Sequence, residues 1–338
     1  MGTKLLRRSA LLALVAVMAI IAAACGNNGT TSGGGGGSPS APLKVALVAP
    51  SATNDLAFTQ SMTDALNALK ESENLDIAVS DNLFVVDDAA SAIRNYASQG
   101  YDLVIAHGSQ FGGSVEQIAP DFPDVSFAWG TAGDTFGLTN VYAYQAASDQ
   151  GGYVQGVLAA GLTKSKVIGV VGPIEVGDAK LYVDGFKAGV EATDPSTSVK
   201  VNYTGSFSDV GLAAEAARSF VAAKADVMTG SAQMVVGAVG VAKTNEVAWF
   251  GTQANQTSLA PSVVVASQVY HWEVVLKQII DGIKAGTLGG QTYTIDLENG
   301  GEVIEYNSDY NLPAEVKAAG DAAIEGIKSG SIQTGVKE

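Results

Sequence analysis

An α/β fold with two lobes, each built on a Rossmann-like, doubly wound parallel sheet, is predicted by three features of this 338-residue sequence. Short apolar runs alternate with longer stretches whose apolar residues recur at helical spacing. The alternation begins again near the middle of the chain. The 296 residues from Leu43 to Glu338 also exceed what one hydrophobic core usually holds, which favours two lobes.

The first half of the chain begins with a near-continuous apolar run over residues 43–49, which Pro50 ends. This pattern is typical of a strand buried on both faces. Phe58, Met62 and Leu66 then lie on one stripe at helical spacing and predict a helix. Further strands are expected at 75–79, 102–106 and 125–129, with helices at 89–98 and 113–119. The order predicts βαβ winding.

The second half repeats this order and ends with extra elements. We expect strands at 166–172, 199–203, 226–229 and 247–251, separated by helices at 151–162, 179–192, 212–223 and 235–243. A strand at 262–269, a helix at 272–285, a strand pair at 293–297 and 302–306, and a helix at 314–328 follow. We expect these last elements to cross between the lobes and form a hinge. Lobe 1 would then comprise 43–147 and 258–290, and lobe 2 would comprise 148–257 and 291–338.

The N-terminal segment has the pattern of a secretory signal peptide over residues 1–24. Lys4, Arg7 and Arg8 precede fifteen uninterrupted apolar residues at 10–24, a run shorter than the roughly 20 residues of a membrane span. Cys25, the only cysteine, follows three alanines and resembles the acylated cysteine of a lipobox. We expect a lipid anchor at Cys25 and a flexible Gly/Ser tether over 25–42. Cleavage that leaves this cysteine unmodified is the alternative.

The net charge and the motifs of the sequence limit which partners and cofactors the protein can bind. Without the three leader cations, 16 basic residues stand against 34 acidic ones, a net charge of −18. Such a surface repels nucleic acid, so nucleic-acid binding is not expected. No metal-ligand motif occurs, and no glycine fingerprint of a dinucleotide site follows the first strand. We therefore expect no metal and no cofactor. We also expect the protein to be a monomer.

Parallel sheets bind ligands beyond the carboxyl ends of their strands. Here those ends are rich in amides, hydroxyls and small residues, with one tryptophan and few charges. This inventory suits a neutral, ring-containing ligand that is held by hydrogen bonds between two lobes. It suits covalent chemistry poorly.

Several segments together resemble the basic membrane protein (BMP, PnrA-like) family of ABC transporter substrate-binding lipoproteins. The segment Asn54–Asp–Leu–Ala–Phe58–Thr–Gln60 is similar to the family element D-x-x-F-N-Q. Further matches are YDLVIAHGSQFG from Tyr101, FPDVSFA from Phe122, GGYVQGVLAA from Gly151, GFKAG from Gly185 and ADVM from Ala225. The likeness runs in order over about residues 43 to 310.

The resemblance implies a type I periplasmic-binding-protein fold whose lobes close on a ligand outside the cytoplasm, where an ABC permease receives it. Characterised relatives capture purine nucleosides, and their ligand contacts carry over to Asp55 and Phe58. The chain departs from the family in its second half. Gln253 and Asn255 replace two carboxylates, and Tyr270 replaces a lysine. Another heteroaromatic or polyhydroxy ligand therefore fits as well as a nucleoside does.

The candidate ligand-binding residues are Asn54, Asp55, Phe58, Gln110, Trp129, Tyr182, Gln233, Gln253, Asn255 and Tyr270. Asp55 also suits a helix cap, and the aromatic residues among them also suit core packing. An enzyme such as a nucleoside hydrolase is the rival class, but a cluster of aspartates at the first strand end is missing. A sugar-binding receptor is the second alternative.

Overall fold

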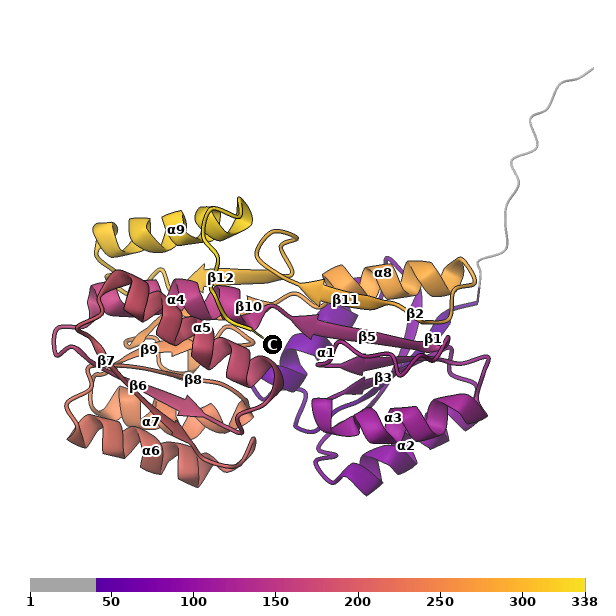
Figure 1. The fold of residues 1–338 in the computed structure, drawn as a ribbon. Coiled ribbons are helices and arrows are strands. Elements are labelled where there is room, and N and C mark those ends of the chain that lie inside the picture. The colour runs from indigo at the N-terminus through magenta and orange to yellow at the C-terminus, as the bar shows by residue number, and fades with distance from the viewer. Residues whose placement is uncertain (1–40, 338) are drawn as a thin grey trace, which may run out of the picture. The chain divides into compact units, whose positions relative to one another are not determined.

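The computed structural model describes residues 41–337, and the predicted signal peptide, Cys25 and most of the tether lie outside them. Two six-stranded sheets define two lobes (Figure 1). Sheet 1 has the order β11-β5-β4-β3-β1-β2, and sheet 2 has the order β12-β10-β9-β8-β6-β7. The antiparallel pair β10 and β12 is the exception among ladders that are otherwise parallel in this part of the chain.

Helices cover both faces of sheet 1, as expected for strands that are apolar on both faces. The strands are β1 (Leu43–Val48), β2 (Leu75–Ser80), β3 (Leu103–His107), β4 (Ser126–Gly130), β5 (Val141–Ala146) and β11 (Thr292–Ile295). The helices are α1 (Phe58–Leu69), α2 (Val86–Ser98), α3 (Gly112–Ile118) and α8 (Glu273–Lys284). Val45 and Leu47 pack with α1 and α8, whereas Ala46 and Val48 pack with α2 and α3. Alternate residues of one strand therefore build two separate cores.

Sheet 2 has the same construction. Its strands are β6 (Val167–Gly172), β7 (Ser198–Tyr203), β8 (Val227–Gly230), β9 (Ala248–Gly251), β10 (Val264–Tyr270) and β12 (Glu302–Tyr306). Its helices are α4 (Ser148–Leu162), α5 (Gly177–Thr193), α6 (Val210–Ala222), α7 (Val236–Thr244) and α9 (Ala314–Lys328). One core lies against α4, α5 and α9, and the other lies against α6 and α7. Short 3-10 turns, η1 (Ser109–Phe111), η2 (Ala119–Asp121), η3 (Gln233–Val235) and η4 (Thr257–Leu259), follow strands or join helices.

Helices α4 and α5 pack at close range because glycines line their contact. A Cβ atom on Gly156 would collide with the carbonyl oxygen of Phe186 in α5. Reciprocally, a Cβ atom on Gly189 would collide with the carbonyl oxygen of Tyr153 in α4. The two glycine-containing motifs that carry the family resemblance thus meet each other across this helix pair, and there they have a packing role.

The chain passes between the sheets three times: from β5 to α4, from β10 to α8, and from β11 to β12. The predicted α/β class and the crossing segments are confirmed. The assignment of 258–290 to lobe 1 is wrong for β10, which forms a parallel ladder with β9 in sheet 2. The assignment of 291–338 to lobe 2 is wrong for β11, which pairs with β5 in sheet 1.

The predicted strand pair at 293–297 and 302–306 is therefore also wrong, because β11 and β12 belong to different sheets. Consecutive strands often pair, but here the connection carries the chain from one lobe to the other. The prediction also omitted β5, whose six residues include Tyr142 and Tyr144, both fully buried in lobe 1.

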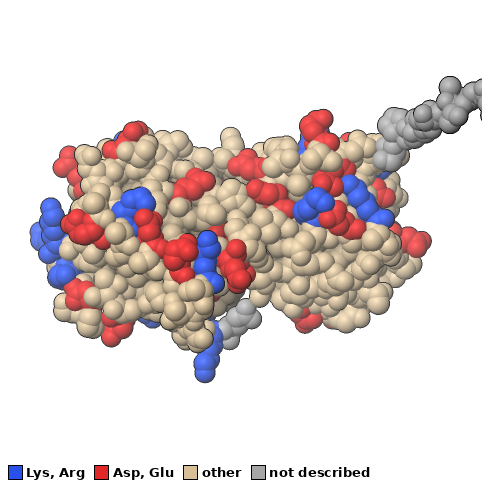
Figure 2. Space-filling model, turned by 90° about the horizontal axis from the view of Figure 1, so that it is seen from above, with Lys and Arg blue, Asp and Glu red and all other residues tan. Residues whose placement is uncertain are grey.

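Charged side chains of both signs are mixed on the face that Figure 2 shows, with basic residues scattered among acidic ones. Exposed ion pairs occur in the described chain, such as Lys317 with Asp321 at 2.7 Å and Lys277 with Asp281 at 2.6 Å. Exposed pairs of this kind contribute roughly 0–1 kcal/mol each. This face therefore offers no continuous basic surface for a polyanion.

Candidate functional site

A cavity lies where the carboxyl ends of strands from both sheets meet, the position expected for a ligand in an open α/β sheet. Its empty space is about 390 Å³, including the part that is open to solvent. Lobe 1 lines it with Pro50, Phe58, Phe84, Gly108, Ser109, Gln110 and Thr131, and lobe 2 lines it with Asp178, Ala179, Phe207, Ala232, Gln233 and Gln253. Both lobes therefore contribute aromatic and hydrogen-bonding side chains.

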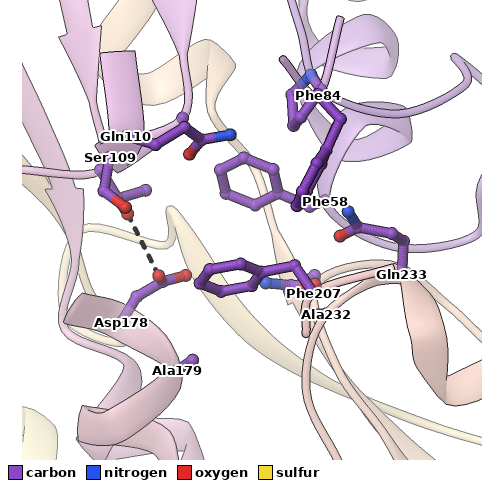
Figure 3. Close-up of a pocket in the computed structure, with 13 residues that line it drawn as sticks. Phe58, Phe84, Ser109, Gln110, Asp178, Ala179, Phe207, Ala232 and Gln233 are labelled. Atoms are coloured by element: carbon purple, nitrogen blue, oxygen red, sulfur yellow. Dashed lines mark hydrogen bonds between the residues drawn. The ribbon is translucent and has the colours of Figure 1, made fainter. Parts of the chain in front are cut away.

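Aromatic rings from both lobes face the cavity. Figure 3 shows Phe58 and Phe84 on one side of it and Phe207 on the other. Phe58 opens α1, Phe84 follows β2, and Phe207 follows β7. Rings on opposite sides of a narrow cavity suit a flat, apolar face of a ligand.

The ring of Phe58 is held from behind by a buried histidine. His107 stacks on Phe58 with 3.9 Å between ring centroids. Its Nε2 lies 3.1 Å from the carbonyl oxygen of Phe58, and its Nδ1 lies 2.8 Å from the hydroxyl of Tyr144. A carbonyl only accepts, so Nε2 carries the proton and the hydroxyl of Tyr144 donates to Nδ1. Burial lowers the pKa of His107 to about 3, so this ring is neutral at physiological pH.

The wall from lobe 2 contains strained backbone. Ala232 follows β8 with φ of +73°, and Gln253 follows β9 with φ of +69°. Side chains other than glycine rarely adopt such angles, at a cost of order 1–3 kcal/mol each. A hydrogen bond of 2.9 Å from the hydroxyl of Thr252 to the carbonyl of Gly230 ties these two strand ends together. Strain held in place at two neighbouring strand ends is typical of a binding site.

Asp178 connects the lobes across the cavity. It lies in the first turn of α5 in lobe 2, and its Oδ1 accepts a 3.1 Å hydrogen bond from Thr131, which follows β4 in lobe 1 (dashed in Figure 3). Burial raises the pKa of Asp178, and hydrogen bonding by Thr131 and Gln253 counteracts only part of that rise. A second interlobe contact, 3.3 Å long, runs from the side chain of Gln256 to the carbonyl of Leu56.

Four of the predicted site residues, Phe58, Gln110, Gln233 and Gln253, line this cavity together. Asp55 does not line it. Its Oδ1 accepts from the N–H groups of Ala57 and Gln60, at 2.9 and 3.1 Å. Its Oδ2 accepts from the hydroxyl of Ser51 at 2.7 Å and from the N–H of Thr59 at 3.2 Å. Asp55 thus caps the start of α1, the alternative that its sequence position left open.

The other five predicted residues also lie away from the cavity wall. Asn54 is exposed, and Asn255 is exposed and donates to Glu305 at 2.6 Å. Trp129 stacks on Phe136 and donates to the carbonyl of Gly108, 3.2 Å away. The remaining two, Tyr182 and Tyr270, are buried; they bond to Gln155 and Thr229, and to Ser148, respectively. A direct ligand contact by Asp55 and by these five residues stays a prediction.

Nine of the 13 cavity-lining residues are not among the predicted ones, and three of these nine, Phe84, Asp178 and Phe207, have aromatic or charged side chains. Phe84 and Phe207 follow β2 and β7, which are edge strands, whereas the predicted glutamines follow inner strands of the sheets. Their signal is a phenylalanine shortly after a predicted strand, in a segment where nothing else demands an apolar residue. Asp178 had the weakest signal, because an acidic residue in a first helical turn normally complements the helix dipole.

Neither metal nor membrane-spanning features occur in the part of the chain that the structure describes. Residues 41–337 contain no group of three or more His, Cys, Asp or Glu side chains placed to hold a metal ion. None of the helices among these residues combines the length and the apolar character needed to cross a bilayer.

The chain is similar to known transport proteins over most of its length. It is 25% identical over 292 residues to a purine-binding protein of Brucella abortus, covering 86% of this chain and 82% of the relative. It is 26% identical over 315 residues to the ABC transporter nucleoside-binding protein BmpA of Lactococcus lactis, covering 86% and 88%. A solved solute-binding protein of an ABC transporter from Conexibacter woesei shares 27% identity with a TM-score of 0.71, covering 86% and 98%.

These neighbours have the type I periplasmic-binding-protein fold, which agrees with the two sheets and three crossings. The family model of the PnrA-like ABC transporter substrate-binding proteins matches residues 43–333. That range contains both lobes and every residue that lines the cavity. Proteins of this family act outside the cytoplasm. The chain therefore belongs to the PnrA-like family of ABC transporter substrate-binding proteins.

Proposed function

We propose that this protein captures a purine nucleoside, or a similar nitrogen heterocycle, between its two lobes and presents it to an ABC permease. The observation that carries the proposal is the pair of aromatic surfaces from opposite lobes, Phe58 and Phe207, on one cavity. Purine rings stack on such surfaces, and the amides of Gln110, Gln233 and Gln253 add hydrogen-bonding groups around them. The names of the purine-binding and nucleoside-binding relatives support the same ligand class.

Capture in this proposal involves no chemical step. A ligand that touches both walls stabilises the closed arrangement of the lobes over the open one by its differential contacts. Thr131 and Asp178 already bond across the cavity, so closure adds contacts that an open form lacks. The permease then recognises the closed form. We infer that the protein is a monomer and is not an enzyme.

Membrane attachment completes the proposal. The apolar run before Cys25 and the uncharged segment after it suit a lipid-anchored protein whose tether spans to the binding domain. Mass spectrometry of the mature N-terminus, with Cys25→Ser as the control, tests this part. An unmodified cysteine or a start elsewhere contradicts it.

Calorimetric titration with adenosine, guanosine, inosine and uridine, and with ribose and myo-inositol as polyhydroxy ligands, tests the ligand class. We expect purine nucleosides to bind, and Phe58→Ala to weaken them by about 10- to 100-fold, since stacking a base on an aromatic ring is worth roughly 1–3 kcal/mol. Phe58→Tyr, which keeps the ring, is the matched control and retains binding.

Binding of the polyhydroxy ligands alone contradicts the purine assignment and favours a sugar receptor. Chromatography of each ligand after incubation separates capture from catalysis. Recovery of free base and ribose contradicts the proposal of a receptor.

A further inference from the structure

Two buried polar atoms on the cavity wall lack a hydrogen-bond partner, and both are acceptors. They are Oδ2 of Asp178 and Oε1 of Gln253. Both residues line the cavity, and the side chain of Gln253 counts among the hydrogen-bonding neighbours of Asp178. Leaving a buried acceptor unpaired is unfavourable, and more so where the group is charged. A pair of such atoms on one wall points to a ligand that supplies the missing donors.

No basic side chain among the described residues that line this cavity neutralises its wall. The residues that line the cavity within 41–337 include no Lys, Arg or His. The nearest lysine along α5, Lys180, pairs with Asp184 instead. The other oxygen of Asp178 is already engaged by Thr131 at 3.1 Å. Within residues 41–337, no donor lies at hydrogen-bond distance and angle from Oδ2 of Asp178.

The position of Asp178 limits what the donor is. Figure 3 shows its carboxylate beside the edge of the Phe207 ring, which lies across the cavity from Phe58. A flat ligand between these rings presents its edge, not its face, to Asp178. Donors that lie in the plane of a heteroaromatic ring are ring N–H and exocyclic amino groups.

We propose that Asp178 and Gln253 select a nitrogen heterocycle that carries two neighbouring N–H donors on one edge, as guanine does. This inference rests on the proposed function and adds the specificity within it. Guanosine presents both a ring N–H and an amino group on that edge, whereas inosine lacks the amino group. A site that is built to pair with a donor discriminates against the analogue without it, because an acceptor is then left unpaired.

The test compares the affinities of guanosine and inosine by calorimetric titration. In the unmodified protein, guanosine binds at least about tenfold more tightly than inosine. Asp178→Leu, which is similar in volume and has no acceptor, weakens guanosine by at least about tenfold and brings the two nucleosides to within about threefold. Asp178→Asn serves as the second variant if the leucine substitution unfolds the protein, and it also reduces the ratio.

Asp184→Asn is the matched control, because Asp184 lies on the same helix but pairs with Lys180 and Lys187 and does not line the cavity. It leaves both affinities unchanged. Equal binding of guanosine and inosine by the unmodified protein overturns the inference, as does an unchanged ratio in both Asp178 variants; the proposed function then stands. Failure of every nucleoside to bind overturns the proposed function, and the inference with it.

Discussion

The cavity walls of lobe 1 and lobe 2 differ in how their polar groups are satisfied. Behind Phe58, the two ring nitrogens of His107 both have partners, and the ring is buried. On the wall of lobe 2, Asp178 and Gln253 each keep a buried acceptor without a partner, and two residues have strained backbone angles. Lobe 1 thus presents a completed stacking surface, and lobe 2 presents an incomplete polar one.

The contrast separates two components of recognition. A satisfied, rigid aromatic surface binds any flat ring, because every base has a π face. An incomplete polar wall favours the ligand that completes it and disfavours the others. The comparison predicts that changes in lobe 1 alter the affinity for all flat ligands together, whereas changes in lobe 2 alter the differences among ligands.

The largest expected effect is a loss of folding stability as the pH rises. It depends on Glu302, at the start of β12 in lobe 2. Burial raises the pKa of Glu302 to about 8. Between the ordinary pKa of about 4.5 and 8, the folded protein holds a proton that the unfolded chain releases. Stability therefore falls as the pH rises through this window, in total by on the order of 5 kcal/mol at most.

Chemical denaturation between pH 5 and 9 measures this loss. Glu302→Gln mimics the protonated acid and flattens the decline, while Glu305→Gln on the same strand controls for the loss of one negative charge. A decline that Glu302→Gln leaves as steep as before would refute the assignment.

The opposite trend is expected from His107 in lobe 1. Its pKa is lowered to about 3 by burial, so between pH 6.5 and 3 the unfolded chain binds a proton that the folded protein does not. The contribution of neutral His107 to the free energy of unfolding is fully present above pH 6.5. It is lost as the pH decreases, by a similar maximum of about 5 kcal/mol. Unfolding titrations of His107→Gln at pH 7 and pH 4 should show a smaller difference than the unmodified protein does.

His271 provides the control for that experiment. Its bond to Glu273 raises its pKa, so its contribution is present at low pH and is lost on alkalinisation. His271→Gln therefore preserves the loss of stability between pH 6.5 and 4. Equal acid sensitivity of His107→Gln and the unmodified protein would rule out a buried neutral histidine.

A smaller effect is expected where the two walls meet. Thr131→Val keeps the shape of the side chain and removes the interlobe hydrogen bond to Asp178. A bond of this kind is worth roughly 1.5–3 kcal/mol when one partner is charged, and less as Asp178 becomes neutral. We expect about a tenfold loss of ligand affinity and a larger radius of gyration by X-ray scattering. Thr139→Val, at an exposed position, changes neither; an unaltered affinity in Thr131→Val would show that the bond does not favour closure.

The sequence predicts most of the secondary structure because most strands are short apolar runs and most helices are amphipathic. The ends of β1 and β3 and the start of α1 agree with the prediction to within a few residues. It misplaces β10 and β11, because both look alike as short apolar strands and nothing local specifies their sheet. The pairing of β11 with β5, which is far away in the sequence, and the pairing of β10 with β9 decide that membership.

The site is predicted less well than the fold. Phe58 and three glutamines were found because they sit at strand ends or in a family motif. Tyr182 is a candidate because relatives often have an aromatic residue there, and Tyr270 is one because it replaces a lysine of the family. The hydroxyl of each nevertheless has a partner inside the core. A tyrosine that is satisfied internally and one that awaits a ligand have the same local sequence signal. Tertiary packing alone distinguishes them.

The three crossings have a consequence for biosynthesis. The core of lobe 1 needs Trp272 and Ile279 from the last crossing segments, and its sheet needs β11 at its edge. A nascent chain delivers these residues only after nearly all of lobe 2 has been translated. The N-terminal lobe therefore cannot finish folding first, and in a chain that stops before α8, Leu47 and its neighbours pack against α1 but lack the contacts of α8. We expect proteases to degrade such fragments, so that they do not accumulate as folded single lobes.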